Sequence, residues 1–231
     1  MPWRETDLSK GQGTGKLLAM SALRDYKQWL HRYDDPGSAL SWRLRTVQEW
    51  LRNDLNSRPG PIDIVSVCAG DGRDIIDVLQ SRHDADRVNV VLLEAHPGVA
   101  DLARQRARDA GLDNVDVHTC DAALTSSYVG AVPADIVLLV GLLGNMSHDD
   151  VSTTIATTPQ MCRDGATLIW SRGRDRDDIN EQVRREFTAV GFIEHDYAES
   201  DQRTRPATGL MHYGGTTVPL DTDRRLFTFF R

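Results

Sequence analysis

The sequence predicts an α/β protein built on a doubly wound parallel sheet, and two observations carry this prediction. From residue 62 onwards, short apolar runs rich in β-branched residues alternate with stretches in which apolar residues recur at helical spacing. The run 135–140 is almost continuously apolar, which is typical of a strand covered on both faces. Strands that alternate with helices in this way indicate βαβ units and a parallel sheet.

The first 60 residues differ from the rest and predict a polar tail followed by a helical cap. Residues 1–16 are polar, and residues 17–31 have helical periodicity up to the turn at 34–37. Ser38 is a good N-cap for a second helix, which ends at the Pro- and Gly-rich residues 57–61. We therefore expect a division into 1–60, the tail and cap, and 61–231, the main domain.

The main domain is expected to begin with a strand at 62–68 and to continue through regular alternation. Further strands are predicted at 89–93, 115–119, 135–140, 166–170, 192–197 and 225–230, with helices at 74–82, 97–110, from about 147, and at 178–190. The connection 199–224 is long and rich in Gly and Pro, so we expect it to be a lid over a substrate.

Three polar features follow the first three strands. Gly70 and Gly72 allow a sharp turn that exposes backbone N–H groups, although a tight strand-to-helix turn needs glycine in any case. Glu94 ends the second strand, where a carboxylate can accept hydrogen bonds from both hydroxyls of a ribose. Asp121 follows the third strand, where it can accept from an adenine amino group. Singly, each acid is also explained as an exposed strand end or a turn residue; together they favour nucleoside binding.

With these features, residues 62–231 resemble the class I S-adenosylmethionine (SAM)-dependent methyltransferases. The resemblance implies a Rossmann-like seven-stranded sheet of order 3-2-1-4-5-7-6, with an antiparallel strand seven matched by 226–230, and SAM as cofactor. It implies cofactor contacts from Ala69, Gly70, Asp71, Gly72, Asp74, Glu94, Ala95, Asp121, Ala122 and Val140.

The glycine turn departs from the family pattern at two positions. Cys68 stands where the family often has an acid, and Asp74 replaces the third glycine. We therefore expect Asp71 or Asp74 to meet the ammonium or sulfonium group of the cofactor. A dinucleotide dehydrogenase, the alternative, needs a small residue where this chain has Ile75.

The loop 141–150 after the fourth strand is expected to carry the chemistry. His148 is the first candidate for a general base, because its ordinary pKa lies near working pH. The alternative is that His148 is only the first exposed residue of a helix capped by Ser147. His212 is the second candidate base. The loop lacks the Asp/Asn-Pro-Pro-Tyr motif of adenine and glutamine N-methyltransferases.

The acceptor is expected to be a small polar molecule, with O-methylation of a saccharide or natural-product hydroxyl favoured. Expected substrate contacts come from Trp29, Tyr33, Asn145 and Tyr213. N-methylation of a small amine and a non-catalytic SAM-binding regulator are the alternatives. A divalent cation is possible and undetermined.

Charge and composition limit the partners. Acidic residues outnumber basic ones, 34 to 27, which disfavours RNA or DNA and favours a neutral or cationic acceptor. The three cysteines show no paired spacing, and no secretory signal or membrane-length apolar run is visible. We expect a cytoplasmic protein without a membrane partner, with a homodimer possible by analogy.

Overall fold

The computed structural model describes residues 31–174, 177–201 and 204–230. These residues form a seven-stranded sheet of order β3-β2-β1-β4-β5-β7-β6, which confirms the predicted topology. The strands are β1 (Ile62–Val67), β2 (Val88–Glu94), β3 (Val115–Thr119), β4 (Ala134–Leu139), β5 (Cys162–Gly173), β6 (Phe192–Glu199) and β7 (Pro206–Tyr213). The helices are η1 (His31–Tyr33), α2 (Ala39–Ser57), α3 (Arg73–Gln80), η2 (Ala85–Arg87), α4 (Pro97–Asp109), η3 (Thr125–Tyr128), α5 (His148–Thr157), η4 (Thr158–Met161) and α6 (Asn180–Ala189).

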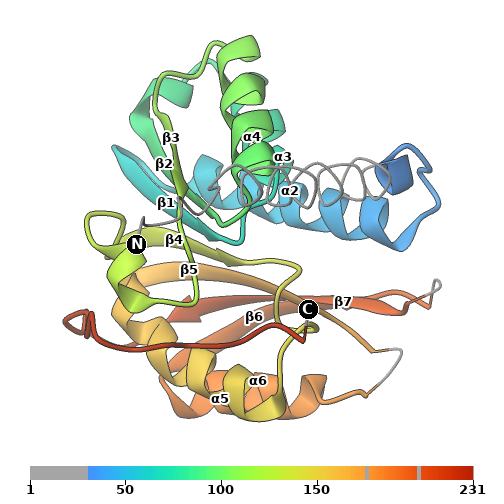
Figure 1. Ribbon diagram of the computed structural model, residues 1–231, viewed down its shortest axis with the longest axis vertical. Helices are drawn as coiled ribbons and strands as arrows, with labels where there is room; N and C mark the ends of the chain where they lie inside the picture. Colours follow the sequence, from blue (N-terminus) through green and yellow to red (C-terminus); the bar gives the residue numbers. More distant parts are fainter. Residues whose placement is uncertain (1–30, 175–176, 202–203, 231) are drawn as a thin grey trace, which may run out of the picture.

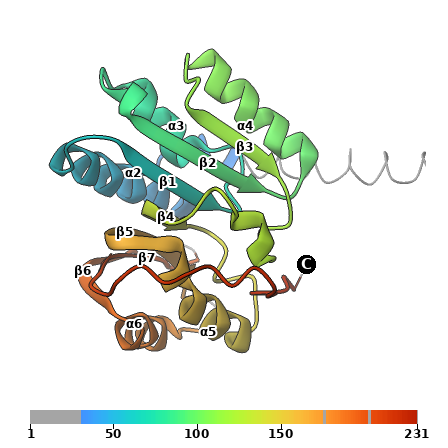
Figure 2. The ribbon, with the colours of Figure 1, turned by 90° about the vertical axis from the view of Figure 1, so that its left-hand side faces the viewer.

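The sheet is covered on both faces, and its strands supply side chains to each face in turn. On β4, Ile136 and Leu138 pack among residues of α2, α3 and α4, whereas Val137 and Leu139 pack among residues of α5 and α6. This alternation follows from the two-residue period of a strand. Figures 1 and 2 show α5 and α6 together, away from α3 and α4. Two apolar cores therefore hold the sheet in place.

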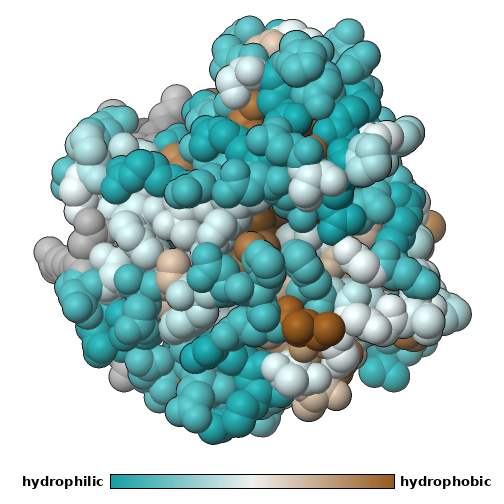
Figure 3. All heavy atoms as spheres, turned by 180° about the vertical axis from the view of Figure 1, so that it is seen from behind, coloured by the Kyte–Doolittle hydropathy of each residue, from teal (hydrophilic) through white to brown (hydrophobic). Residues whose placement is uncertain are grey.

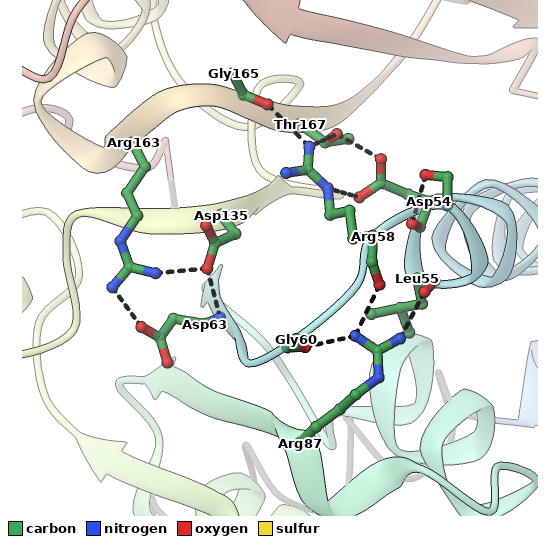
Figure 4. Close-up of polar contacts among 11 residues, drawn as sticks. Asp54, Leu55, Arg58, Gly60, Asp63, Arg87, Asp135, Arg163, Gly165 and Thr167 are labelled. Carbon is green, nitrogen blue, oxygen red and sulfur yellow. Dashed lines mark hydrogen bonds and ion pairs between the residues drawn. The ribbon is translucent and has the colours of Figure 1, made fainter.

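Helix α2 is fixed to the amino edge of the sheet by a polar network (Figure 4). Arg58 forms an ion pair with Asp54 at 2.7 Å and donates to the Thr167 hydroxyl on β5 at 2.9 Å. Asp54 accepts from the same hydroxyl at 2.8 Å, and Arg87 donates to the carbonyls of Leu55, Arg58 and Gly60. The network anchors the end of α2, whose beginning lies at the opposite edge. The predicted helix at 17–31 lies outside the described residues, apart from His31.

The final antiparallel strand is not where the sequence analysis placed it. β7 spans Pro206–Tyr213 and pairs with both β5 and β6, in the middle of the predicted lid 199–224. Apolar β7 residues such as Met211 are buried, so this stretch is sheet core and not a lid. The prediction of a strand at 225–230 was therefore wrong.

Residues 224–230, which we call the C-terminal segment, run across the sheet face that carries α5 (red in Figure 1). The Leu226 N–H donates to the Ala123 carbonyl at 2.7 Å, and the Phe230 N–H donates to the Asn145 carbonyl at 2.9 Å. Leu226 and Phe227 are buried in the core on this face. The segment thus links the loop after β3 to the loop after β4.

The described surface carries few large apolar side chains. Val129, Ile193, Val218 and Phe230 are the exposed ones, and the face in Figure 3 is mostly hydrophilic with small separate apolar patches. Within the described part of the chain, no helix combines the length and apolar character needed to cross a bilayer.

Candidate active site

The candidate site lies at the carboxyl edge of the sheet, where β1, β2, β3, β4 and β5 end side by side. The chain order reverses between β1 and β4, whose neighbours lie on opposite sides. Ligands of open α/β sheets bind outside the carboxyl ends of the strands at such a reversal. The loops after these strands therefore contain the residues to examine.

The turn after β1 has the strained backbone that its glycines predict. Gly70 and Gly72 have φ of 62° and 71°, and Cys68 also adopts a positive φ of 54°. A Cβ atom at Gly72 would lie 2.6 Å from the Leu92 Cδ1 and 2.9 Å from the Ile76 Cδ1, and its φ of 71° also favours glycine at the start of α3. The turn directs the N-terminus of α3 towards the carboxyl edge, where it favours negatively charged or electron-rich groups.

Glu94, the last residue of β2, lies against this turn. Its Oε2 accepts from the Gly70 N–H at 3.0 Å, and its Oε1 accepts from the His96 N–H at 2.8 Å. Burial raises the pKa of the Glu94 carboxyl, while these backbone donors act in the opposite direction. The carboxylate is held rigidly and each oxygen keeps capacity to accept from a second donor. Ala69 precedes the turn, and Ala95 is exposed beside Glu94.

Asp121 lies in the loop after β3 and has partners that the sequence did not reveal. Its Oδ1 accepts from the Ala123 N–H at 3.0 Å, and its Oδ2 pairs with Arg225 of the C-terminal segment at 3.0 Å. The side chain is 48% exposed, so both oxygens remain accessible. Ala122 is buried, and its carbonyl accepts from the Tyr128 hydroxyl at 2.7 Å. Arg225 was not expected here, because it was assigned to a strand.

The two acids that follow the glycine turn differ in their surroundings. Asp71 is buried, and its carboxylate pairs with Arg73 at 2.7 Å and with Arg106 of α4 at 3.1 Å. These two guanidinium groups already compensate the charge of Asp71, which argues against its predicted role towards a cationic group. Burial raises the pKa of Asp74 to about 6, opposed by Arg43 and reinforced by Asp71. Asp74 is thus the better placed of the two to meet a positive charge.

Tyr33 contacts two arginines near the glycine turn. Arg73 begins α3 directly after the turn, and Arg43 lies on α2. The Arg73 guanidinium is 4.2 Å from the centre of the Tyr33 ring, and Arg43 donates to the Tyr33 hydroxyl at 2.8 Å. Burial raises the pKa of the Tyr33 phenol, and Arg43 lowers it. Tyr33 therefore lies beside the glycine turn, and its contact with substrate stays a prediction. Trp29 lies outside the described residues.

His148 is the first residue of α5, and the helix cap predicted for this point is present. The Ser147 hydroxyl accepts from the Asp150 N–H at 3.1 Å. In addition, His148 Nε2 lies 2.6 Å from Asp177 Oδ2, a partner that the sequence analysis did not identify. His148 is about half exposed. The structure thus brings together a histidine and a carboxylate that are 29 positions apart in the chain, beside the loop after β4.

His212 and Tyr213 do not belong to this site. Both are on β7, which is antiparallel, and His212 pairs with Thr167 near the beginning of β5. The site lies at the other end of β5, beyond Gly173, which pairs with Pro206. The separation of six positions between Thr167 and Gly173 places His212 about 20 Å from the carboxyl edge. The roles predicted for His212 as a base and for Tyr213 in substrate binding are therefore wrong.

A cavity of about 330 Å³ opens at the ends of β4 and β5, next to Val140. Its lining comes from several distant segments: Arg32, Ala39, Leu40, Arg43, Gly141, Gly144, Asn145, Ser171, Arg172, Gly173, Asp177, Thr204, Pro206 and Ala207. Asn145 was predicted to contact substrate and lines this cavity, while its Nδ2 donates to the Gly141 carbonyl at 2.9 Å. The three arginines were missed, because only the folded chain brings them together.

Metal ligation was left undetermined by the sequence. Among the described residues, no group of three or more His, Cys, Asp or Glu side chains is close enough to hold a metal ion. His148 and Asp177 form only a pair.

Comparison with known proteins identifies the fold. No protein-family model and no curated protein matches the sequence. Among solved structures, the chain is similar to magnesium protoporphyrin IX methyltransferase from Synechocystis PCC 6803 with bound SAM, at 16% identity and a TM-score of 0.64, covering 84% of this chain and 96% of that one. It is also similar to Burkholderia thailandensis 1,6-didemethyltoxoflavin-N1-methyltransferase, with bound 1,6-didemethyltoxoflavin and S-adenosylhomocysteine, at 15% identity and a TM-score of 0.61, covering 92% and 94%.

A third similar structure is an O-methyltransferase family protein from Burkholderia thailandensis, at 13% identity and a TM-score of 0.60, covering 79% of this chain and 58% of that one. The three matches share the sheet architecture at low identity. Together with the strand order and the antiparallel β7, they show that this chain has the fold of the class I SAM-dependent methyltransferases.

Proposed function

We propose that this chain is a SAM-dependent methyltransferase that methylates a hydroxyl of a small polar molecule. The observation that carries the proposal is the Glu94 carboxylate at the end of β2, fixed against the Gly70 amide in the turn after β1, beside the switch point between β1 and β4. A half-buried acceptor held beside a glycine turn suits the paired hydroxyls of a ribose. The methyltransferase neighbours of the fold support the same cofactor.

The residues at this edge fit the parts of SAM. Glu94 would bind the ribose hydroxyls, and Asp121 would accept from the adenine amino group through its exposed oxygens. Asp74 would lie towards the positive charges of the methionine end, where a cation favours its ionised form. Bound SAM supplies an electrophilic methyl group on a sulfonium. The chain itself has to align the acceptor and hold its proton.

His148 and Asp177 are arranged to take that proton. Neutral His148 accepts a proton from the acceptor hydroxyl, and Asp177, 2.6 Å from Nε2, stabilises the resulting imidazolium. Asp177 also lines the cavity, which supports this role for the pair. Asn145, also in the lining, would help to orient the acceptor.

N-methylation of an amine has less support from the geometry. Asp34 and Asp35, which precede α2, are acids that could attract a cationic amine, but Asp35 accepts from the Gly37 N–H at 2.9 Å to close a turn. Neither Asp34 nor Asp35 lines the cavity. A non-catalytic SAM-binding regulator would share the cofactor residues, so turnover is the property that separates it from an enzyme.

The first experiment is calorimetric titration with S-adenosylhomocysteine, with NAD as control. We expect binding of the first and not of the second. NAD binding without S-adenosylhomocysteine binding would overturn the proposed cofactor. Methyl transfer to a panel of hydroxyl and amine acceptors then tests the reaction, and a panel on which only amines are methylated would replace O-methylation by N-methylation.

A further inference from the structure

The cavity at the ends of β4 and β5, which we call the arginine cavity, has a charge that the composition of the chain does not suggest. Arg32, Arg43 and Arg172 all line it, and Asp177 is the one acid among the described lining residues. The Asp177 carboxylate pairs with His148. Among the described lining residues, positive charges therefore outnumber negative ones, although the whole chain has a net charge of −7.

Arg43 is the best-defined of the three arginines. It reaches from α2 to the end of β4, where a Cβ atom on Gly141 would lie 3.0 Å from its Nη1. Its Nη2 donates to the uncharged Tyr33 hydroxyl, while its Nε is buried without a hydrogen-bond partner. Among the described residues Arg43 forms no ion pair, although its charge acts on the Asp74 carboxylate. A partly buried guanidinium in such surroundings is stabilised by an anionic partner.

Arg172 continues the positive charge along the end of β5. Its Nη1 donates to the backbone carbonyls of Gly173 and Asp177, which fix the position of the guanidinium in the cavity wall. Arg32 is exposed at the rim. The neutral polar groups of Asn145 and Ser171 complete this side of the cavity. Arginine side chains bind carboxylate and phosphate groups through two parallel hydrogen bonds, which gives orientation as well as affinity.

We propose that the acceptor carries an anionic group, a carboxylate or a phosphate, which the arginine cavity binds while the acceptor hydroxyl faces His148. This inference rests on the proposed function, because it assigns the substrate class of the same site. The volume of about 330 Å³ suits a small molecule and not a polymer. An anionic acceptor replaces the neutral or cationic acceptor that the overall acidity of the chain favoured.

A carboxylate is also present at the methionine end of SAM, so Arg43 has two possible anionic partners. Titration of Arg43→Gln with S-adenosylhomocysteine and with 5′-methylthioadenosine, which lacks the amino-acid portion, distinguishes them. If Arg43 serves the acceptor, the variant binds both nucleosides as the wild type does. Weakened binding of S-adenosylhomocysteine alone assigns Arg43 to the cofactor, and the acceptor anion then depends on Arg172 and Arg32.

The decisive experiment uses the wild-type complex with S-adenosylhomocysteine, whose formation is measured first. Failure of that complex to form contradicts the proposed function, and is distinct from failure of the anion proposal. The preformed complex is then titrated with inorganic phosphate, phenyl phosphate, 4-hydroxybenzoate and the uncharged 4-hydroxybenzamide. We expect at least one anion to bind at least tenfold more tightly than the amide, with an affinity that falls as salt rises.

Arg172→Gln is expected to lower the affinity for that anion at least tenfold and to leave S-adenosylhomocysteine binding unchanged. Arg185→Gln is the matched control, because Arg185 is exposed on α6 and pairs with Glu181. A complex that binds none of the three anions, or binds the anion and the amide equally, overturns the proposal. So does an Arg172→Gln variant that binds the anion as tightly as the wild type.

Discussion

The carboxyl edge of the sheet has two halves that are built differently. The half after β1, β2 and β3 takes its polar groups from turns that directly follow a strand, such as Gly70, Glu94 and Asp121. The half at β4 and β5 is a cavity lined by residues as distant in sequence as Arg32, Arg172 and Ala207. The first half depends on local turn chemistry, and the second depends on how helices and strands pack. Mutations can test whether the two halves also separate cofactor binding from catalysis.

The largest effect is expected from His148→Ala in the second half. Loss of a general base lowers kcat by a factor of about 10²–10⁴, while the affinity for S-adenosylhomocysteine stays at the wild-type value. Steady-state kinetics with the best acceptor, together with calorimetry, measures both. His118→Ala is the control, because His118 forms a similar pair with Asp116 at 2.8 Å on β3. Equal kcat values for His148→Ala and the wild type would remove the assignment of His148 as base.

Gly72→Ala is the corresponding test of the first half. The added Cβ meets the buried Leu92 Cδ1 at 2.6 Å in a backbone with a φ of 71°, so the Leu92 side chain or the turn must shift. We expect the affinity for S-adenosylhomocysteine to fall at least about 30-fold, equivalent to about 2 kcal/mol. Gly111→Ala has a similar φ of 70° with no atom within 4 Å. This control should lose about 1 kcal/mol of stability and bind normally. Similar binding by both variants would show that the shape of the turn is not needed.

Glu94→Gln asks whether charge, and not only hydrogen bonding, contributes in the first half. The amide oxygen can still accept from the Gly70 N–H, whereas the amide nitrogen replaces the oxygen that accepts from the His96 N–H. Two ribose hydroxyls bind a carboxylate more strongly than an amide, and we expect about a tenfold loss in affinity for S-adenosylhomocysteine. Calorimetry measures it, and an unchanged affinity would place the ribose elsewhere.

The smallest effect is expected from Asp74→Asn, which should change how the stability of the protein depends on pH. The pKa of Asp74 is raised from 3.8 to about 6, so its contribution to stability is present below pH 3.8 and is lost as the pH rises through 6. Asparagine stays neutral. Because Asp74 is partly exposed, we expect the variant to gain about 1 kcal/mol at pH 7.5, about 2–4 °C in Tm, and nothing at pH 3.5. Asp113→Asn, in the exposed loop before β3, is the control. A gain that is independent of pH would contradict this account.

The sequence predicted the fold and the first half of the edge because both are encoded locally. Alternating apolar runs indicated the strands, and the glycines and acids after them indicated the turns; the structure confirms these positions at Gly72 and Glu94. The error at β7 has a physical cause as well. Gly209 and Pro206 made this stretch look like a loop, yet β7 is buried between two other strands, where packing outweighs local propensity.

The second half could be predicted only in fragments. His148 and Asn145 were found because they lie in one short loop after β4, whereas Arg43 on α2 and Asp177 beyond β5 carry no local mark of function. The composition of the whole chain was also misleading. Its net charge is negative, whereas the described residues that line the arginine cavity carry more positive than negative charges. Two histidines of similar appearance in the sequence, His148 and His212, proved to lie at opposite edges of the sheet, because β7 runs antiparallel.

The C-terminal segment has a consequence for synthesis of the protein. Arg225 pairs with Asp121, 104 positions earlier, and the Thr228 N–H donates to Asp150, 78 positions earlier. During synthesis, residues 224–230 leave the ribosome after every other residue of the site. The loops after β3 and β4 therefore lack these contacts until the C-terminal segment has emerged. Chains stalled before residue 224 should therefore contain all seven strands and still lack the C-terminal segment, whose contacts join the two halves of the carboxyl edge.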